Sequence, residues 1–427
     1  MKESLFVKYA AWMSAIILGV VTKINGGKTE LSYLHKTMLT EELSTDLKWS
    51  SLVVNSSIVA ADVVAMDSPM PLKKRDAIST ADGEITKLGM KKQMSEKQLS
   101  DIDILVAKKI ENKVIVEKIF DDAVSCTMGV YEKIEYIFLK GLSSGVALIE
   151  DTVNVGTGIR IDYGYLPANK FGATLPWSDP ASKPLTDIER VRKEARTKGA
   201  VLKFVMMDQD TFDNLAANEQ VRQYFAFSLN FVGNNSNIPV PDLEQVNSML
   251  QKKFKLQVTV IDRTVITERD GKRTVQTPWE PGKVIFLETQ KVGRLMYGIL
   301  AEETRKSKAA TYTKAGKFIL IKKWSSEEPF AEYTSSQALA IPVIDAVDSI
   351  YLLDSEESTT DVQTEGNSTF NYKQAVYTKT SVINAINLAT GKTTAKANNT
   401  DAKLLEYVNE LSEEQILVFE ANIVASA

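Results

Sequence analysis

The chain has 427 residues, of which 44% are hydrophobic and 25% are charged, and its 51 basic and 55 acidic residues give a formal net charge of −4. This composition is that of an average soluble protein, so it indicates neither global disorder nor a membrane protein, and the charge argues against nucleic acid as the main partner. One cysteine, Cys126, excludes an internal disulfide framework, and one histidine, His35, makes acid–base catalysis and zinc binding less expected.

Residues 1–50 are interpreted as an N-terminal arm. The apolar run from Ala10 to Val21 resembles the core of a signal peptide, but it is too short to span a bilayer as a helix and no small-x-small cleavage pattern follows it. We therefore prefer a short amphipathic helix that packs on another surface.

Residues 51–94 are interpreted as an extended loop region. The segment 67–94 is polar and holds too few apolar residues to build a core, so we expect it to project and to become ordered only against a neighbour. Within it, the pair Asp82-Gly83 predicts a hairpin turn.

This loop carries a small basic cluster, Lys73-Lys74-Arg75. Such a cluster could touch DNA, but a solvated loop face or an ion pair between subunits is the preferred interpretation. We predict that Lys73, Lys74 and Arg75, together with Glu84, contact a neighbouring chain.

A long helix is predicted next. Ser95-Glu-Lys-Gln98 matches a capping box, and apolar residues recur at helical spacing from Leu99 to Ile137. The pattern predicts a helix from Glu96 to Lys140, continuous or with a single break, with Gly141 following its end. Such a helix is ~65 Å long, more than a compact domain needs, and indicates a spine. The match of Gly141-Leu-Ser-Ser-Gly145 to a serine-nucleophile motif fails because no strand precedes it.

Residues 146–175 have the pattern of a β-hairpin with its turn at 156–158. In the segment Trp177–Ile188 that follows, two prolines force extended or turn backbone, and Thr186 or Asp187 can cap a helix over Glu189–Thr197. A rigid corner before a helix is scaffolding and not an active site. We assign it as a hinge made by Trp177, Asp179, Pro180, Pro184 and Asp187.

Strands and helices then alternate, which predicts a mixed α/β unit over residues 185–300. Its expected elements are a buried strand at 200–207, a helix at 210–225, strands at 256–261 and 283–287, and a hairpin at 269–272. Asp208 and Asp210 resemble a carboxylate pair for a divalent metal, but capping of the following helix is the preferred use. Further strands are predicted at 318–324 and 338–353.

The C-terminal part is interpreted as a separate piece. Residues 355–368 are polar and acidic, which is typical of a linker. Beyond them, apolar spacing predicts two helices, at 375–388 and 401–423, and Ser412-Glu-Glu-Gln415 matches a capping box. The task of this tail stays open among a stabilising appendage, a contact for a fibre or decoration protein, and an inert embellishment.

The segment Trp177–Ile188 resembles the tailed-bacteriophage major capsid proteins of the capsid protein E family, in which a tryptophan, an Asp-Pro pair and a Pro-Leu-x-Asp-Ile run introduce a helix of the axial domain. The resemblance covers roughly residues 30–353 and implies an α+β, Hong Kong 97-type phage capsid fold. The implied domains are an N-terminal arm at 1–50, an extended loop region at 51–94, a peripheral domain with the spine helix at 95–184, an axial domain at 185–300, strands returning to the peripheral domain at 301–354, and a linker with an additional C-terminal α-rich domain at 355–427.

This resemblance implies a major capsid protein without enzymatic activity that self-assembles into hexamers and pentamers of an icosahedral shell around the double-stranded DNA genome of a tailed phage. The implied partners are further copies of the chain, a portal protein, and scaffolding or decoration proteins, with packaged DNA near only by non-specific proximity and with no membrane and no cofactor. The protein would be assembled in the host cytoplasm and reside in the virion capsid, and shell expansion would shear the spine against the axial domain. Two alternatives stay open: an encapsulin-like nanocompartment shell, and a soluble metal-dependent hydrolase using Asp208 and Asp210.

Overall fold

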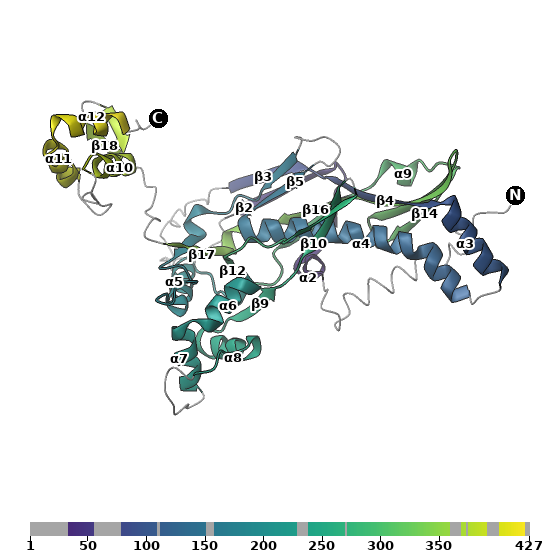
Figure 1. The fold of residues 1–427 in the computed structure, drawn as a ribbon, viewed down its shortest axis with the longest axis horizontal. Helices are drawn as coiled ribbons and strands as arrows, with labels where there is room; N and C mark the ends of the chain where they lie inside the picture. The colour runs from purple at the N-terminus through teal and green to yellow at the C-terminus, as the bar shows by residue number, and fades with distance from the viewer. Residues whose placement is uncertain are drawn as a thin grey trace, which may run out of the picture. The chain divides into compact units, whose positions relative to one another are not determined.

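In the computed structural model, the described residues are 33–54, 78–108, 112–150, 158–228, 238–269, 271–358, 369–372, 375–390 and 401–422. The chain divides into two compact units, Met1–Glu357 and Ser358–Ala427, and its described elements are drawn in Figure 1. The apolar run at 10–21, the basic cluster at 73–75 and the segment 391–400 lie outside the described residues. The α+β class expected from the sequence is confirmed.

The predicted long helix is present as two helices, α3 (Glu96–Ala107) and α4 (Asn112–Ser144). At the start of α3, the side-chain oxygen of Gln98 accepts a hydrogen bond from the backbone N–H of Ser95 at 2.8 Å, as a capping box requires. Apolar residues of α4 are buried in the first hydrophobic core, among them Ile134, Ile137 and Phe138.

Helix α4 does not end at Gly141, so this prediction is wrong. The helix runs on to Ser144, and Gly145, with φ of +79°, is the left-handed residue that ends it. Gly141 has a packing role instead, since a Cβ there would lie 2.4 Å from Cε2 of the fully buried Tyr163.

The first core lies between α4 and a six-stranded sheet of order β1-β13-β16-β15-β14, with β4 also paired to β16. Only the β1–β13 pair is parallel. Figure 1 shows α4 running along β16. The strands are β1 (Leu39–Leu43), β4 (Lys87–Ser95), β13 (Gly293–Gly298), β14 (Ala310–Ala315), β15 (Ile319–Glu327) and β16 (Phe330–Ile344).

Two parts of the expected loop region are strands. Strand β3 (Ile78–Glu84) pairs with β2 (Lys48–Val54), and β4 joins the six-stranded sheet, so the expectation of a projecting loop as far as residue 94 is wrong. Asp82 and Gly83 form no hairpin turn but lie inside β3. Gly83 is opposite Trp49, where a Cβ would approach Nε1 to 2.8 Å, so glycine is needed for packing.

The hairpin predicted after the spine helix is confirmed. Strands β5 (Val146–Glu150) and β6 (Gly158–Asp162) pair antiparallel, and the residues that join them lie outside the described ones. The 3₁₀ helix η1 (Pro167–Asn169) then leads to β7 (Lys170–Ala173).

A second sheet has five strands in the order β7-β17-β12-β8-β9, of which β8 and β9 are parallel. The remaining bounds are β8 (Phe204–Asp208), β9 (Gln257–Ile261), β12 (Lys283–Leu287) and β17 (Tyr351–Ser358). We expected residues 351–353 to close the peripheral sheet, and this is wrong, because β17 pairs with β12. The hairpin predicted at 269–272 is confirmed as β10 (Val265–Arg269) and β11 (Lys272–Gln276).

Four helices pack on the second core. They are α5 (Pro184–Thr197), α6 (Gln209–Ala217), α7 (Glu219–Ser228) and α8 (Leu243–Phe254). The helix predicted at 210–225 is two helices, because the extended backbone of Asn218 ends α6 and its side chain accepts from the N–H of Gln220 in α7. The helix predicted from Glu189 begins five residues earlier, with Pro184 in the first helical position, where the missing N–H costs nothing.

The second unit, Ser358–Ala427, has its own core. Its elements are β18 (Thr369–Tyr372), β19 (Ala375–Thr378), α10 (Lys379–Thr390), α11 (Asp401–Asn409) and α12 (Glu413–Asn422). The helix predicted over 401–423 is broken because Ser412 caps α12: Gln415 N donates to Ser412 Oγ, and Ser412 N donates to the Gln415 side chain. No helix among the described residues is long and apolar enough to cross a membrane.

Candidate functional site

The corner predicted as a hinge is centred on a buried tryptophan. Trp177 is 2% exposed and belongs to the second core. Its indole Nε1 donates to Oδ2 of Asp187 at 3.2 Å, and its backbone N–H donates to the carbonyl of Ser355 in β17 at 2.8 Å. The corner is thereby fixed both to α5 and to β17 of the five-stranded sheet.

Asp187 is a fully buried carboxylate in the first turn of α5. Besides the indole, it accepts from the backbone N–H of Thr174 at 3.1 Å and from its hydroxyl at 2.5 Å, and it pairs with Nη2 of Arg190 at 3.3 Å. The sequence led us to expect that Thr186 or Asp187 caps this helix. Neither does, because both lie inside α5, which begins at Pro184. The role of Asp187 is to join the residue that follows β7, the tryptophan and the helix.

The other assigned corner residues form the turn between these anchors. The exposed Asp179 accepts a hydrogen bond from the N–H of Ala181 at 2.8 Å, and its own carbonyl accepts from the N–H of Ser182 at 3.0 Å. Pro180 is exposed at the turn, whereas Pro184 is buried at the helix start. The five assigned residues thus lie together in one short segment.

Of the predicted contact residues, Glu84 lies within the described part of the chain. Glu84 is exposed at the end of β3, opposite Lys48 of β2. Lys73, Lys74 and Arg75 lie outside the described residues.

The preferred use of Asp208 is confirmed. It precedes α6, and its carboxylate accepts from the N–H of Thr211 at 3.3 Å and from the Thr211 hydroxyl at 2.6 Å. Asp210 lies in the first helical turn. Within the described parts of the chain, no three histidine, cysteine or acidic side chains are grouped as a metal site would need.

A buried polar cluster that sequence reasoning missed joins the segment 33–38 to α4. Helix α2 (Leu34–Met38) is held by Glu135, whose carboxylate accepts from the backbone N–H groups of Leu34 and His35 at 2.8 and 2.9 Å. The same carboxylate lies 2.6 Å from Nδ1 of His35. Glu135 and the histidine are both almost completely buried.

Electrostatics fix the charge states in this cluster. Burial alone would raise the pKa of Glu135, but the hydrogen bonds from His35 and from the backbone outweigh it and hold this pKa below its usual value. Burial lowers the pKa of His35, against the opposite effect of the carboxylate. Because a carboxylate can only accept, Nδ1 of the neutral imidazole carries the proton.

A second pair of groups completes the cluster. Glu132 accepts from the hydroxyl of Tyr33 at 2.8 Å and from Nη2 of Arg263 at 2.7 Å. The sequence carries a signal for this cluster: Glu135 falls in the apolar series of Tyr131, Phe138 and Leu142, at spacings of four, three and four residues. An acidic residue on the buried stripe of a helix needs a partner, which here is the only histidine of the chain.

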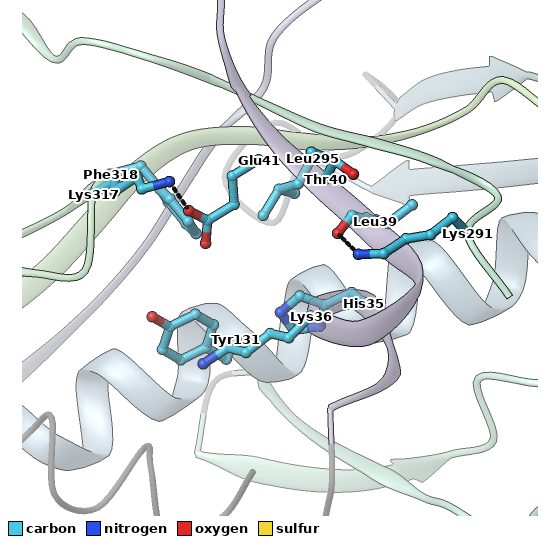
Figure 2. Close-up of a pocket in the computed structure, with 10 residues that line it drawn as sticks. All are labelled: His35, Lys36, Leu39, Thr40, Glu41, Tyr131, Lys291, Leu295, Lys317 and Phe318. Atoms are coloured by element: carbon cyan, nitrogen blue, oxygen red, sulfur yellow. Dashed lines mark hydrogen bonds and ion pairs between the residues drawn. The ribbon is translucent and has the colours of Figure 1, made fainter.

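Next to this cluster lies a cavity of about 260 Å³. Figure 2 shows its lining, which comes from α2, β1, α4 and β13 and from the segments just before β13 and β15. Three lysines and one glutamate contribute to it: Lys36, Lys291, Lys317 and Glu41.

Comparison with known protein families decides the class of this chain. The sequence model of the family described as phage major capsid protein E matches residues 29–354. The chain belongs to this family. The match spans both sheets and ends inside β17, before the second unit begins. No curated protein sequence matches the chain.

Solved structures with similarity to the chain were also found. One is a protein assigned as the capsid protein of a prophage in Escherichia coli CFT073, with 15% identity, a TM-score of 0.48, and coverage of 79% of this chain and 97% of that chain. Another is the capsid of Myoviridae phage XM1, with 10% identity, a TM-score of 0.39, and coverage of 76% and 93%. A third is a virus-like particle from Pyrococcus furiosus, with 11% identity, a TM-score of 0.38, and coverage of 81% and 99%.

The family match confirms the resemblance stated from the sequence. Together with α4 against the six-stranded sheet and the separate five-stranded sheet, it supports the Hong Kong 97-type fold. This chain is a phage major capsid protein, a structural protein of the shell, and its place is the virion capsid. Neither the nanocompartment nor the hydrolase is favoured, and Asp208, on which the hydrolase depended, caps a helix.

Proposed function

We propose that this capsid protein assembles in the host cytoplasm as homo-hexamers and homo-pentamers of an icosahedral shell around the double-stranded DNA of a tailed phage, and that it has no catalytic activity. The observation that carries the proposal is the family match over residues 29–354. A closed shell repeats the same few interfaces many times, so modest contacts of one subunit add up to a stable particle.

Exposed apolar side chains support self-assembly. Ile266 and Val275 face each other across the β10–β11 hairpin and are 64% and 66% exposed. Phe227, near the end of α7, is 81% exposed. Adjacent exposed apolar side chains, such as the pair on this hairpin, are typical of a surface that a partner covers, whereas a single exposed residue such as Phe227 is common on any protein.

Further contacts belong to the same proposal. Lys73, Lys74, Arg75 and Glu84 are assigned to contact a neighbouring subunit, and a portal protein and scaffolding or decoration proteins are the other partners. Packaged DNA is expected only near the shell, without a dedicated site, because the chain carries a net charge of −4.

The corner of Trp177, Asp179, Pro180, Pro184 and Asp187 is proposed as the rigid side of a hinge between the two sheets. Its anchors on β17 and α5 keep the corner fixed to the five-stranded sheet. Rotation during shell expansion would then be absorbed by the segments that join the two sheets, 288–292 and 345–350, and by 163–169, which joins the β5–β6 hairpin to β7.

The test is assembly of the purified chain, followed by sedimentation velocity and negative-stain electron microscopy. The wild-type chain is expected to form closed particles, and the double variant Ile266→Ser/Val275→Ser is expected to stay as small species with an unchanged urea midpoint. Thr267→Ser/Thr274→Ser alters the neighbouring cross-strand pair of the same hairpin and is the matched control.

Two outcomes would count against the proposal. A wild-type chain that stays monomeric at high concentration contradicts shell formation. If the serine double variant assembles like the control, the hairpin is not part of the interface between subunits.

A further inference from the structure

The part of the protein built on the five-stranded sheet carries opposite charges at its two ends. Strands β8 and β9 are parallel, so their first residues lie at one end of the sheet and their last residues at the other. Lysine and arginine gather at the first end, and aspartate gathers at the second. Each strand has five residues, so the two ends are about 17 Å apart at the usual rise of a strand.

The basic end is built by α5, by α8 and by the residue before β8. The backbone N–H of Gln257 donates to the carbonyl of Lys203 at 2.8 Å, which places the start of β9, just after α8, beside this lysine. Arg192 of α5 and Lys253 of α8 both lie against the ring of Phe254, each 5.0 Å from its centroid. We call this region the basic surface, and its members are Arg192, Arg196, Lys203, Lys252, Lys253 and Lys255.

The basic surface has an excess of positive charge that its neighbours do not balance. The nearby Glu189 and Glu194 form ion pairs with Lys193 and Lys198, at 3.1 and 3.8 Å, and no described carboxylate forms an ion pair with a member of the basic surface. All members except Arg192 are exposed. Gathered cations of this kind attract an acidic partner.

The opposite end of the same two strands holds the complementary charge. Asp208 is paired with Ile261 in the ladder of β8 and β9, so Asp210 and Asp262, which follow these two residues, leave the sheet at the same end. Asp213 lies about one turn further along α6. All three aspartates are exposed, and none forms an ion pair with another described residue. We call Asp210, Asp213 and Asp262 the acidic surface.

We propose that the basic surface of one copy binds the acidic surface of the next copy, as a head-to-tail contact within the hexamers and pentamers. This inference rests on the proposed function, which requires such rings. A contact between two unlike surfaces repeats around a ring, whereas a contact of one surface with itself joins only two copies. Opposite charges across such a contact speed the encounter and fix its register. A nucleic acid would match the basic surface alone and leave the acidic surface without a partner.

Charge reversal in two separate full-length chains tests this contact. The first variant, Arg196→Glu/Lys203→Glu/Lys252→Glu, has acidic side chains at both ends, and the second, Asp210→Lys/Asp213→Lys/Asp262→Lys, has basic side chains at both. Each variant alone is expected to lose particle formation, because every contact between its copies then brings like charges together.

An equal mixture of the two variants is expected to assemble, because they can alternate around a ring with opposite charges at each contact. Alternation closes only for an even number of copies, so electron microscopy is expected to show hexamers and no intact pentamers. A variant that merely fails to fold is not rescued by mixing, and the urea midpoint of each variant checks its fold separately.

The control is Lys97→Glu/Lys306→Glu/Lys308→Glu, which reverses three exposed lysines away from the five-stranded sheet and changes the net charge by the same amount as the first variant. It is expected to assemble like the wild type and, when mixed with the second variant, not to bring that variant into particles. This separates pairing of the two surfaces from a general effect of net charge.

Three outcomes would overturn the inference. They are normal assembly of either variant alone, no assembly of the equal mixture, and rescue of the second variant by the control. Where the wild-type chain forms particles beside such an outcome, the proposed function stands and only this contact is refuted. A wild-type chain that forms no particles contradicts the proposed function, and the inference fails with it.

Discussion

At the scale of single residues, buried charge is the feature on which the stability of the subunit depends most. Asp187 is a fully buried carboxylate with hydrogen-bond donors from Thr174, which directly follows β7, from the Trp177 corner and from α5. A carboxylate can accept from all of them at once, whereas the amide nitrogen of an asparagine can accept from none. The donors that surround this position therefore require a carboxylate and not an amide.

Asp187→Asn is expected to lower the free energy of unfolding by about 3 kcal/mol, because it leaves Trp177 Nε1 or Thr174 with an unpaired buried donor and Arg190 without its ion pair. Asp179→Asn, at the exposed turn of the same corner, is the control and is expected to change it by less than about 1 kcal/mol. Urea unfolding followed by tryptophan fluorescence measures both. Equal effects of the two substitutions would contradict the anchoring role of Asp187.

The His35–Glu135 pair predicts how stability depends on pH. Burial lowers the pKa of His35, so below about pH 6.5 the unfolded chain binds a proton that the folded chain does not, and stability falls as the pH falls. The pKa of Glu135 is also lowered by folding, so this group adds a further loss of stability in more acid solution, below the pKa that it has in the unfolded chain. Both groups therefore make the subunit less stable in acid.

His35→Gln keeps a donor for Glu135 but cannot titrate. The wild type is expected to lose up to about 1.4 kcal/mol per pH unit between about pH 6.5 and pH 5.5, and the variant is expected to be nearly flat over that window. Urea unfolding at several pH values is the measurement. Parallel pH profiles of the two proteins would show that the imidazole is not held neutral by the fold.

This cluster marks the limit of sequence reasoning at the residue scale. The scarcity of histidine was visible, and so was a glutamate on the apolar stripe of the predicted spine helix. Nothing in the spacing pairs His35 with Glu135, because they are 100 residues apart and meet only when α2 packs on α4. By contrast, the capping roles of Asp208 and Ser412 act over three residues and could be predicted.

At the scale of elements, the presence of a helix or strand was easier to predict than the residues at which it begins and ends. The spine helix, the hairpin at 269–272 and the strand before Asp208 were expected from periodicity and are found. The end of the spine helix was not predicted correctly, and neither was the strand around Gly83. Gly141 and Gly83 were both interpreted as residues of a helix end or a turn, but they are required by contacts with Tyr163 and Trp49. A glycine in a sequence does not reveal whether the backbone or a neighbour requires it.

The two glycines of α4 allow this distinction to be tested. Gly141→Ala would place its Cβ 2.4 Å from the ring of Tyr163, which is fully buried and held by its hydrogen bond to the carbonyl of Pro342. It is expected to destabilise the subunit by about 1–3 kcal/mol despite the better helix propensity of alanine. Gly129→Ala meets the flexible end of Met90 at 2.6 Å, so it is expected to be nearly neutral.

Thermal unfolding of both variants gives the comparison. A Gly141→Ala protein as stable as Gly129→Ala would mean that Tyr163 can move aside and that Gly141 has no packing role.

At the scale of the whole molecule, strand order is what the sequence could not supply. Residues 338–353 have one continuous apolar pattern, but β16 pairs in the first sheet and β17 in the second. Periodicity shows which face of a strand is buried and says nothing about which neighbour it takes. The chain passes repeatedly between the two cores, so the unit Met1–Glu357 must fold with its strands from 351 onward in place.

This connectivity predicts where the chain can be shortened. Tyr351 and Leu353 of β17 are buried in the second core, and Leu353 is opposite Val284 of β12. The second unit has a separate core built on residues such as Val382, Leu404 and Phe419. A chain ending at Ser358 is therefore expected to keep the urea midpoint of the first unit, whereas one ending at Ile350, which lacks β17, is expected to fail to fold.

Circular dichroism, urea unfolding and particle formation of the two shortened chains measure the difference. If the chain ending at Ser358 unfolds at lower urea than the full chain, the two units are energetically coupled, contrary to the expectation from their separate cores. If that chain keeps its midpoint but forms no particles, the second unit contributes to assembly and not to the stability of the subunit, because only contacts between copies would then have been lost.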